Sequence, residues 1–333
     1  MLSNGTGQNK SRREYGFGGS IVEKTKTVSI IIPTLNAEGY LPPLIHALKT
    51  QTHVPEEILI VDSESTDQTC AIAKQEQIRV HKVKRSTFDH GGTRNLAAGL
   101  TTGDYIFFLS QDALPVNEHY IEEMVKSLEQ DQVVMTSARQ IARVTAPPIE
   151  KLTRRFNYPA DSFVRTKADI ARLGIKAYFF SDVCSAYRRE FFEEMGGFES
   201  PILTNEDMLM ASRAFGHGYA IGYCAEAKVY HSHKYTLTQQ YKRNFDVSVF
   251  LQTHKDEIES GSSTGEGIRM VLYIEKELLK KGRIGSMIWC VFDSGAKFLG
   301  NRAGKKFASM SQETILKKTS NPGYWKKKFS DQK

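Results

Sequence analysis

Four clusters of polar residues, each directly after a short apolar run, are the first candidates for chemistry in this sequence. They are Pro33–Asn36, Asp62–Asp67, Phe88–Asn95 and Ser110–Asp112. In an open, mostly parallel sheet, ligands bind beyond the carboxyl ends of the strands. We therefore expect the four clusters to lie along one edge of a sheet, where a nucleoside diphosphate needs such a row of polar groups.

Asp62 stands at the end of an apolar run, where its carboxylate can recognise a nucleobase. A carboxylate only accepts hydrogen bonds, and uracil and thymine offer an imino N–H that neutral cytosine lacks. Such a contact selects pyrimidine nucleotides. Alternatively, Asp62 or Asp67 caps the helix that follows, as Asp residues often do. We favour capping for Asp67 and base recognition for Asp62.

The glycine pair Gly91-Gly92 stands just before a predicted helix, so it can bring backbone N–H groups close to a phosphate. Arg94, in the first turn of that helix, can add a charge-assisted fork. A tight turn explains the glycine pair equally well. The sequence contains neither G-x-G-x-x-G nor G-x-x-x-x-G-K-[ST], which argues against dinucleotide-binding folds and P-loops.

Asp112 follows the apolar run Tyr105–Leu109, so its carboxylate should emerge at the edge of the sheet. Hard oxygen ligands suit Mg²⁺ or Mn²⁺, which could bridge Asp112 to a diphosphate and neutralise its charge. His231 and His233 follow another apolar run and point to the same side of an extended segment. Either can complete the metal shell or contact phosphate. Alternatively, Asp112 is an ordinary turn residue and the two histidines are ordinary surface residues without a metal-binding role.

Glu206 and Asp207 stand at the start of a helical pattern, within the run Thr204–Asp207. One carboxylate, Asp207, can act as the general base that removes the proton of an attacking hydroxyl. A single base is enough for group transfer, unlike the two carboxylates of a glycoside hydrolase. The alternative is that Asn205 or a neighbour only caps the helix.

The elements that must position these residues alternate between apolar runs and helical patterns, which predicts an α/β fold with a doubly wound, mostly parallel, Rossmann-like sheet. Beyond residue 145 the pattern loosens, and from about 236 to 318 it becomes mainly helical. The expected strands are 28–32, 58–61, 78–83, 105–109, 133–136, 219–223 and 227–230, and the expected helices are 40–51, 67–77, from 93 onward, and 117–130.

Composition is that of an ordinary globular protein, with 40% hydrophobic and 25% charged residues in 333. We expect a polar leader over 1–25, a catalytic domain over 26–260 and a basic helical extension over 261–333. The sequence has neither an apolar run long enough to span a membrane nor the apolar core of a secretory signal. Its four cysteines are widely spaced, which fits a reducing, cytoplasmic compartment.

Several segments together resemble the large inverting nucleotide-sugar glycosyltransferase family with the GT-A fold, over roughly residues 26–260. They are VSIIIPTLNAEGYL, EILIVDSESTDQT, FFLSQDALP, FEEMGGFES and TNEDMLMASRAFGHGY. Within that family, FDHGGTRNLAAG, SQDALP, VCSAYRREFFEEMGGF and VYHSHKYTLTQQYKRNFDVSVF resemble the bacterial rhamnosyltransferase branch.

The resemblance implies roles for individual residues. Asp207 is then the base, supported by Glu206, and Asp112 is the metal carboxylate, with His231 or His233 as helpers. The usual acidic motif has Asp where this chain has Ser110, so weaker metal binding is expected. The residues implied to face the nucleotide sugar are Pro33, Thr34, Asn36, Asp62, Ser63, His90, Gly91, Arg94 and Gln111.

The branch resemblance also implies substrates and a location. The donor would be dTDP-β-L-rhamnose, and the acceptor a lipid-linked or cell-surface glycan made at the cytoplasmic face of the cell membrane. For this donor, we expect side chains from Tyr178–Phe180 or Cys184 to pack on the methyl group of the sugar. A donor of the UDP-hexose type is the alternative within the same family.

The basic charge of the chain belongs to its C-terminal region. The formal net charge is +7, while residues 281–333 alone carry twelve Lys or Arg and three acidic residues, or +9. Charge alone fits nucleic acid and an anionic membrane surface equally. Residues 284–299 mix Trp289, Phe292 and Phe298 with flanking basic residues, as in an interfacial helix, and we favour peripheral membrane contact. Packing against the catalytic domain is the alternative.

Two functions of other classes compete with sugar transfer. A sugar nucleotidyltransferase would use the same kind of sheet and metal, but no glycine- and lysine-rich phosphate loop follows the first strand. Its product, pyrophosphate instead of a free nucleoside diphosphate, distinguishes it. A nucleic-acid-binding protein would explain the calculated pI of about 9.0, but the basic charge is confined to the tail and no nucleic-acid-binding motif is present. We therefore expect no nucleic acid partner.

Overall fold

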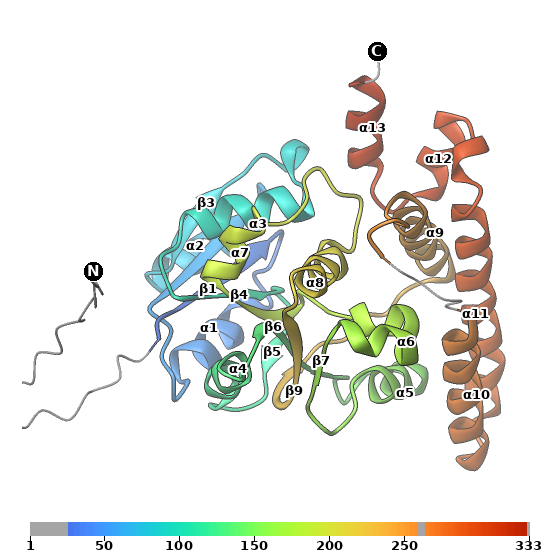
Figure 1. The fold of residues 1–333 in the computed structure, drawn as a ribbon, viewed down its shortest axis with the longest axis horizontal. Helices are drawn as coiled ribbons and strands as arrows, with labels where there is room; N and C mark the ends of the chain where they lie inside the picture. The colour runs from blue at the N-terminus through green and yellow to red at the C-terminus, as the bar shows by residue number, and fades with distance from the viewer. Residues whose placement is uncertain (1–25, 259–263, 332–333) are drawn as a thin grey trace, which may run out of the picture.

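The computed structural model describes residues 26–258 and 264–331. The expected leader over residues 1–25 and the expected boundary near residue 260 lie outside this part of the chain. The remaining expectations for helices and strands can be compared directly with the fold (Figure 1).

In the described part of the chain, one nine-stranded sheet has the order β3-β2-β1-β4-β8-β6-β9-β5, and β7 pairs with β9. The strands β1 to β4 pair in parallel, as do β6 and β9, whereas β8 runs antiparallel to both β4 and β6. The strands are β1 Val28–Thr34, β2 Glu57–Asp62, β3 Arg79–Lys82, β4 Tyr105–Leu109, β5 Leu114–Pro115, β6 Val133–Ile141, β7 Phe163–Arg165, β8 Cys184–Arg188 and β9 Ala220–Tyr230.

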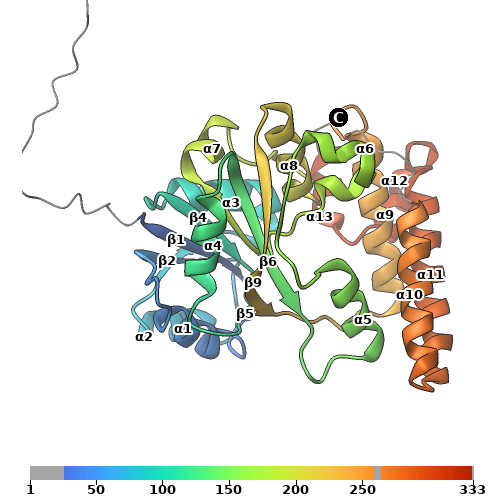
Figure 2. The same cartoon turned by 60° about the horizontal axis from the view of Figure 1, so that its bottom comes forward.

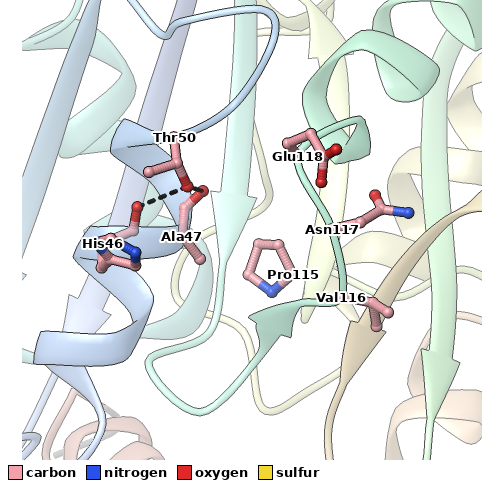
Figure 3. Close-up of a pocket in the computed structure, with 7 residues that line it drawn as sticks. All are labelled: His46, Ala47, Thr50, Pro115, Val116, Asn117 and Glu118. Carbon is pink, nitrogen blue, oxygen red and sulfur yellow. Dashed lines mark hydrogen bonds between the residues drawn. The ribbon is translucent and has the colours of Figure 1, made fainter.

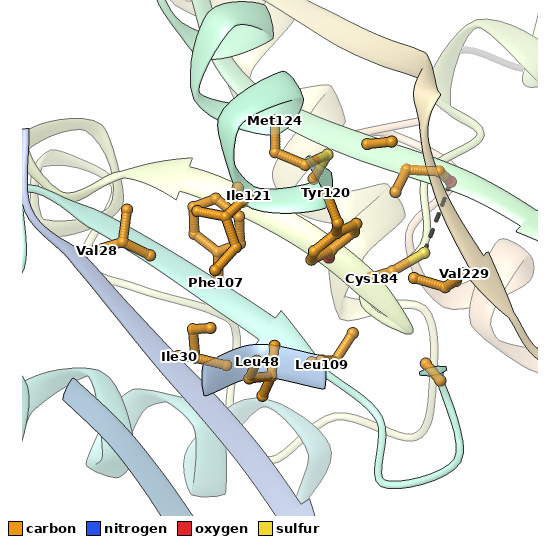
Figure 4. Close-up of a cluster of buried hydrophobic side chains, with 14 of the residues drawn as sticks. Val28, Ile30, Leu48, Phe107, Leu109, Tyr120, Ile121, Met124, Cys184 and Val229 are labelled. Atoms are coloured by element: carbon orange, nitrogen blue, oxygen red, sulfur yellow. Dashed lines mark hydrogen bonds between the residues drawn. The ribbon is translucent and has the colours of Figure 1, made fainter. Parts of the chain in front are cut away.

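Two apolar cores lie on opposite faces of this sheet, because consecutive strand residues point to opposite sides. Ile30 and Ile32 pack with helices α1 (Leu41–Lys49) and α4 (Tyr120–Leu128), and part of this core is drawn in Figure 4. Ile31 and Phe108 pack on the other face with helices α3 (His90–Gly99), α7 (Arg189–Glu194) and α8 (Glu206–Gly216). Helices on both faces of a mixed sheet confirm the predicted α/β class.

The predicted elements differ from the fold in several places, including the short strands β5 and β7, which were not predicted. Helix α3 begins at His90, three residues earlier than expected, because Asp89 accepts a hydrogen bond from the Gly92 N–H and caps it. The two strands expected over 219–223 and 227–230 are one strand, β9, interrupted by a register shift against β6. Strand β8 was not predicted, because CSAYR carries no continuous apolar run.

The C-terminal region is helical, as expected, and lies beside the β6–β9 end of the sheet (Figures 1 and 2). Helix α11 crosses α9 closely because Gly300 and Gly304 have no side chains there: a Cβ on either would meet the carbonyl oxygen of Tyr241 or Phe245 within 2.5 Å. The remaining helices are α2 Thr69–Gln75, α5 Pro148–Asn157, α6 Ile170–Leu173, α9 Leu237–Thr253, α10 Thr264–Lys280, α11 Ile284–Gly304, α12 Gln312–Lys318 and α13 Pro322–Ser330. Among the residues described, none of these helices is long and apolar enough to cross a membrane.

Candidate active site

The predicted polar clusters meet at one edge of the sheet, as expected. Parallel strands β1, β2 and β4 end at Thr34, Asp62 and Leu109, and β9 ends just before His231. Strand β8 runs the other way, so its first residue, Cys184, pairs with Leu109 at this same edge. The edge therefore gathers groups from five strands of the chain.

The loops after β1 and β2 are tied together around Asp62, which is buried. Its carboxylate accepts hydrogen bonds from the Thr34 hydroxyl at 3.1 Å and from the Ser65 hydroxyl and N–H at 2.5 and 3.0 Å. The Ser63 N–H donates to the Thr34 carbonyl. Asp62 thus holds two loops in register, a role that the sequence interpretation did not include beside base recognition.

Gln111 connects the loop after β1 to the end of β4, and Asn36 connects the same loop to the loop after β2. The Gln111 side chain accepts from the Leu35 N–H at 2.8 Å and donates to the Leu35 carbonyl at 3.2 Å. Asn36, exposed and with φ of 51°, accepts from the Thr66 N–H at 2.9 Å. Both side chains therefore shape the loop that follows Pro33 and Thr34, the last residues of β1.

Asp112, His231 and His233 come together in a cluster that can hold a metal ion. Asp112 Oδ2 lies 3.5 Å from His231 Nε2 and 3.7 Å from His233 Nδ1. The residues were proposed from separate parts of the sequence, and the fold brings all three within ligating reach of one point. One carboxylate oxygen and two imidazole nitrogens form a donor set that suits Mn²⁺ better than Mg²⁺, which prefers oxygen ligands alone.

Gln140 on β6 fixes the orientation of His231. Its Oε1, which can only accept, lies 2.8 Å from His231 Nδ1, so Nδ1 carries the proton and Nε2 presents its lone pair toward Asp112. Arg154 on α5 also donates to Gln140 Oε1. Burial, reinforced by the positive charge of Arg154, lowers the pKa of His231 to about 2. The imidazole is therefore neutral at physiological pH, the form that binds metal ions.

Asp207 belongs to a second cluster at the start of α8, together with three other ionisable residues. Its Oδ2 accepts from the Asp182 N–H at 3.2 Å, and its Oδ1 accepts from the Met208 N–H at 2.7 Å. Arg94 forms an ion pair with Glu206 at 3.1 Å, and its Nε lies 3.9 Å from Asp182 Oδ2. Asp182 and Glu206 thus share one buried guanidinium, and Asp207, which accepts from the Asp182 N–H, lies beside them.

This crowding makes Asp207 more basic than an ordinary carboxylate. Desolvation, together with the charges of Asp182 and Glu206, raises the pKa of Asp207 well above its usual value. Desolvation also raises the pKa of Asp182 to about 6, although Arg94 opposes the shift. The raised pKa of Asp207 lies closer to the pH at which an enzyme works, and general base catalysis is most efficient when the two are close.

A chain of contacts connects the two clusters. Gln140, which holds His231, also donates to the Ser181 hydroxyl at 2.9 Å, and the next residue, Asp182, holds Asp207. The Asp182 carboxylate is itself fixed by the Ser185 and Tyr187 hydroxyls at 2.7 and 2.6 Å. Asp182 and Gln140 were both missed in the sequence. The one available signal was the position of Asp182 just before the segment VCSAYRREFFEEMGGF.

Three residues expected to contact the nucleotide sugar lie in other surroundings. Arg94 was expected as a free phosphate fork, but its guanidinium is buried and already paired with two carboxylates. Gly91 is required by packing, because a Cβ there would lie 2.0 Å from the Glu199 carbonyl oxygen. His90 lies beside Glu206, with His90 Nδ1 and Glu206 Oε1 4.0 Å apart. His90 and Arg94 therefore lie against Glu206 at the start of α8, and Gly91 packs against the segment that precedes this helix.

The aromatic segment expected to pack on the sugar is part of the core instead. Tyr178, Phe180 and Cys184 are buried in the two cores of the sheet. Phe179 packs with Tyr158 and Tyr223. The expectation of a sugar-methyl pocket at these residues is therefore wrong for the three buried side chains.

A surface hollow of about 460 Å³ lies elsewhere, between α1 and the segment after β5 (Figure 3). Its lining is formed by His46, Ala47, Thr50 and residues 115–118. None of the predicted site residues lines it. The candidate active site is therefore the polar edge of the sheet and not this hollow.

Comparison with known proteins identifies the family of the chain. The family model described as glycosyl transferase family 2 matches residues 29–196. The O-antigen chain rhamnosyltransferase RfbN of Salmonella typhimurium is 36% identical over 304 residues, which cover 90% of this chain and 96% of that protein. The O-antigen chain rhamnosyltransferase WbaN of Salmonella anatum is 37% identical over 303 residues, covering 89% and 95%.

Among solved structures, the mannosyltransferase PcManGT from Pyrobaculum calidifontis, in complex with GDP-Man and Mn²⁺, has a similar fold. The TM-score is 0.53 with 16% identity, covering 92% of this chain and 88% of that chain. At this identity the likeness concerns the fold alone.

Proposed function

The chain belongs to glycosyl transferase family 2 and is a glycosyltransferase, and on this premise we propose that it transfers L-rhamnose from dTDP-β-L-rhamnose, with inversion, to a hydroxyl of a lipid-linked precursor of a cell-surface polysaccharide. The observation that carries the proposal is the pairing of a basic carboxylate, Asp207, with a metal-ligating cluster on one sheet edge. Similarity to two O-antigen rhamnosyltransferases over about nine-tenths of the chain supports the choice of sugar and acceptor.

Asp207 supplies the base in a single displacement. As the acceptor oxygen forms its bond to the anomeric carbon, the hydroxyl proton moves to a carboxylate oxygen of Asp207. The bond between that carbon and the diphosphate oxygen breaks on the opposite face, and dTDP leaves with the electron pair. The Asp182 and Met208 N–H groups keep Asp207 oriented throughout.

Asp112, His231 and His233 would hold a divalent ion, which when bound neutralises negative charge on the diphosphate. Gln140 keeps the His231 lone pair directed into the cluster. Arg143 donates to the Asp112 carbonyl at 2.9 Å and so holds the loop that carries this carboxylate. Arg243, whose guanidinium lies over the Tyr235 ring, adds positive charge near both histidines.

The loops after β1 and β2 would receive the nucleoside. Thr34 and Asp62 are the last residues of these strands, and Asn36 and Ser63 lie in the loops. Gln111 braces the first loop from just beyond the end of β4. The hydrogen bonds already made by Asp62 pre-organise this surface, which lowers the cost of ordering it on binding.

A panel of nucleotide sugars tests the donor. We expect dTDP-L-rhamnose to give a higher kcat/KM than UDP-glucose, UDP-galactose or UDP-N-acetylglucosamine, measured as nucleoside diphosphate released with a matched acceptor. The thymine methyl adds only about 1–3 kcal/mol of discrimination, so the sugar itself must supply the remainder. A higher kcat/KM with any UDP-hexose would refute the rhamnosyl assignment and leave the family assignment intact. Release of pyrophosphate would indicate a nucleotidyltransferase instead.

The charge of Asp182 should set the pH at which Asp207 is protonated. Because that charge raises the pKa of Asp207, an Asp182→Asn variant should have its acid limb of activity shifted to lower pH. The test is kcat/KM measured as a function of pH for the parent, for this variant and for Asp131→Asn, an exposed aspartate that serves as control. A lower rate with an unshifted acid limb would mean that Asp182 only supports the fold.

A lipid-linked acceptor also implies where in the cell the enzyme works. We place the enzyme in the cytoplasm, peripherally bound to the inner face of the cell membrane, where such precursors are extended. This part of the proposal depends on the acceptor and on the basic charge of residues 281–333.

A further inference from the structure

Helices α10 and α11 expose a row of large apolar side chains. Each of these side chains is between 49% and 64% exposed, and they come from two helices that lie side by side (Figures 1 and 2). We call them the α10–α11 face: Ile268, Leu272, Leu279, Ile284, Ile288, Trp289, Val291, Phe292, Phe298 and Leu299.

This face is not needed to hold the two helices on the protein. On α10 and α11 a different set of side chains, including Ile274, Leu278 and Cys290, is buried against Leu152 of α5. Gly300 and Gly304 attach α11 to α9. The helices thus have one apolar side that packs and a second that is left exposed, which marks an interaction surface.

Exposed basic residues stand at both ends of α11. Lys281 and Arg283 precede the helix, while Arg302, Lys305 and Lys306 lie at or just beyond its end. An apolar helix face flanked by basic residues is typical of helices that lie in the surface of an anionic bilayer. A second copy of this chain would instead bring the same positive charges opposite one another.

We propose that the α10–α11 face docks the protein on a bilayer containing anionic lipid, with α11 lying in the plane of the surface. The inference deepens the proposed function, since it assigns the surface by which the enzyme reaches a lipid-linked acceptor. Its evidence, however, is independent of the identity of the sugar.

Helix α5 connects this face to the active site. On one side Ile149 and Leu152 pack against α10 and α11. On the other side Arg154 donates to Gln140, and Glu150 Oε1 accepts from the His233 N–H at 2.8 Å. Helix α5 therefore links the two helices that carry the docking face to the cluster of Asp112, His231 and His233.

Trp289 provides a direct test, because it is 49% exposed whereas Trp325 is buried. With vesicles of phosphatidylglycerol and phosphatidylcholine, the full chain should co-sediment and its tryptophan emission should shift to the blue. Vesicles of phosphatidylcholine alone should bind much less. In Trp289→Phe the spectral shift should disappear, since Trp325 is already shielded from water.

A matched pair of variants tests the face itself. Phe292→Glu and Val54→Glu each place one carboxylate at an exposed apolar position, 58% and 66% exposed respectively. Phe292→Glu should weaken binding to the anionic vesicles by about tenfold or more, since it removes apolar contact and adds a repelled charge. Val54→Glu, on the loop after α1 and far in sequence from the α10–α11 face, should bind like the parent.

The outcomes separate this inference from the proposed function. Equal vesicle binding by both Glu variants, or no binding by the parent, would overturn it. So would a parent dimer in solution that Phe292→Glu converts to a monomer. Transfer to a water-soluble acceptor should be unchanged in Phe292→Glu, so failure of the sugar assignment appears only in the donor panel, and failure of the docking face only with vesicles.

Discussion

Replacing Asp207 with Asn should reduce the rate of sugar transfer by about 10²–10⁴-fold, the usual contribution of a general base. The amide has nearly the shape of the carboxylate and can still accept from the Met208 or the Asp182 N–H. It cannot take the proton of the acceptor hydroxyl. Nucleotide binding should therefore be nearly unchanged, as measured by titration calorimetry with dTDP beside steady-state rates.

The same variant should also report on the electrostatics of the site. Because the pKa of Asp207 is raised in the folded protein, its ionisation opposes folding at pH values above that pKa, and this cost disappears as the pH falls below the ordinary Asp value. The melting temperature of Asp207→Asn should therefore equal or exceed that of the parent at pH 8, and the difference should shrink in acid. Turnover within tenfold of the parent would remove Asp207 from the mechanism.

The sequence predicted best those site residues that directly follow regular strands. Asp62 and Asp112 each end or follow an apolar run, and in a doubly wound sheet such positions meet at one edge whatever the details of packing. The position of His231 beside Asp112 follows from the same rule, because His231 is the first residue after β9. Local pattern and topology are enough for these positions.

The supporting residues were not predictable, because their roles depend on contacts between distant parts of the chain. Gln140 stands inside β6 and contacts His231, 91 residues away. Asp182 precedes β8, a strand without an apolar run. Arg94 follows a glycine pair in the first turn of a helix, as a phosphate ligand often does, but its guanidinium forms an ion pair with Glu206 on α8. Nothing in the sequence near Arg94 indicates that a carboxylate so far along the chain will lie beside it.

Activity should depend on a divalent ion held by Asp112, and this dependence is the second large effect that we expect. Chelation with excess EDTA, or Asp112→Ala, should lower the rate by about 10²-fold or more, since compensation of the charge on a leaving diphosphate is worth several kcal/mol. Mn²⁺ should restore the rate at lower concentration than Mg²⁺, because two of the three ligands are imidazoles. His46→Ala, which removes an exposed imidazole on α1, is the matched control.

Metal binding can be measured apart from catalysis, by the loss of the free Mn²⁺ electron paramagnetic resonance signal when protein is added without donor. The parent and His46→Ala should both reduce that signal, and Asp112→Ala should reduce it much less. His231→Ala should weaken binding as Asp112→Ala does, because each variant removes one of the three ligands that the cluster offers. Unchanged activity in excess EDTA would contradict the assignment. The charge of the departing nucleotide would then have to be met by arginines beside the cluster, such as Arg143 and Arg243.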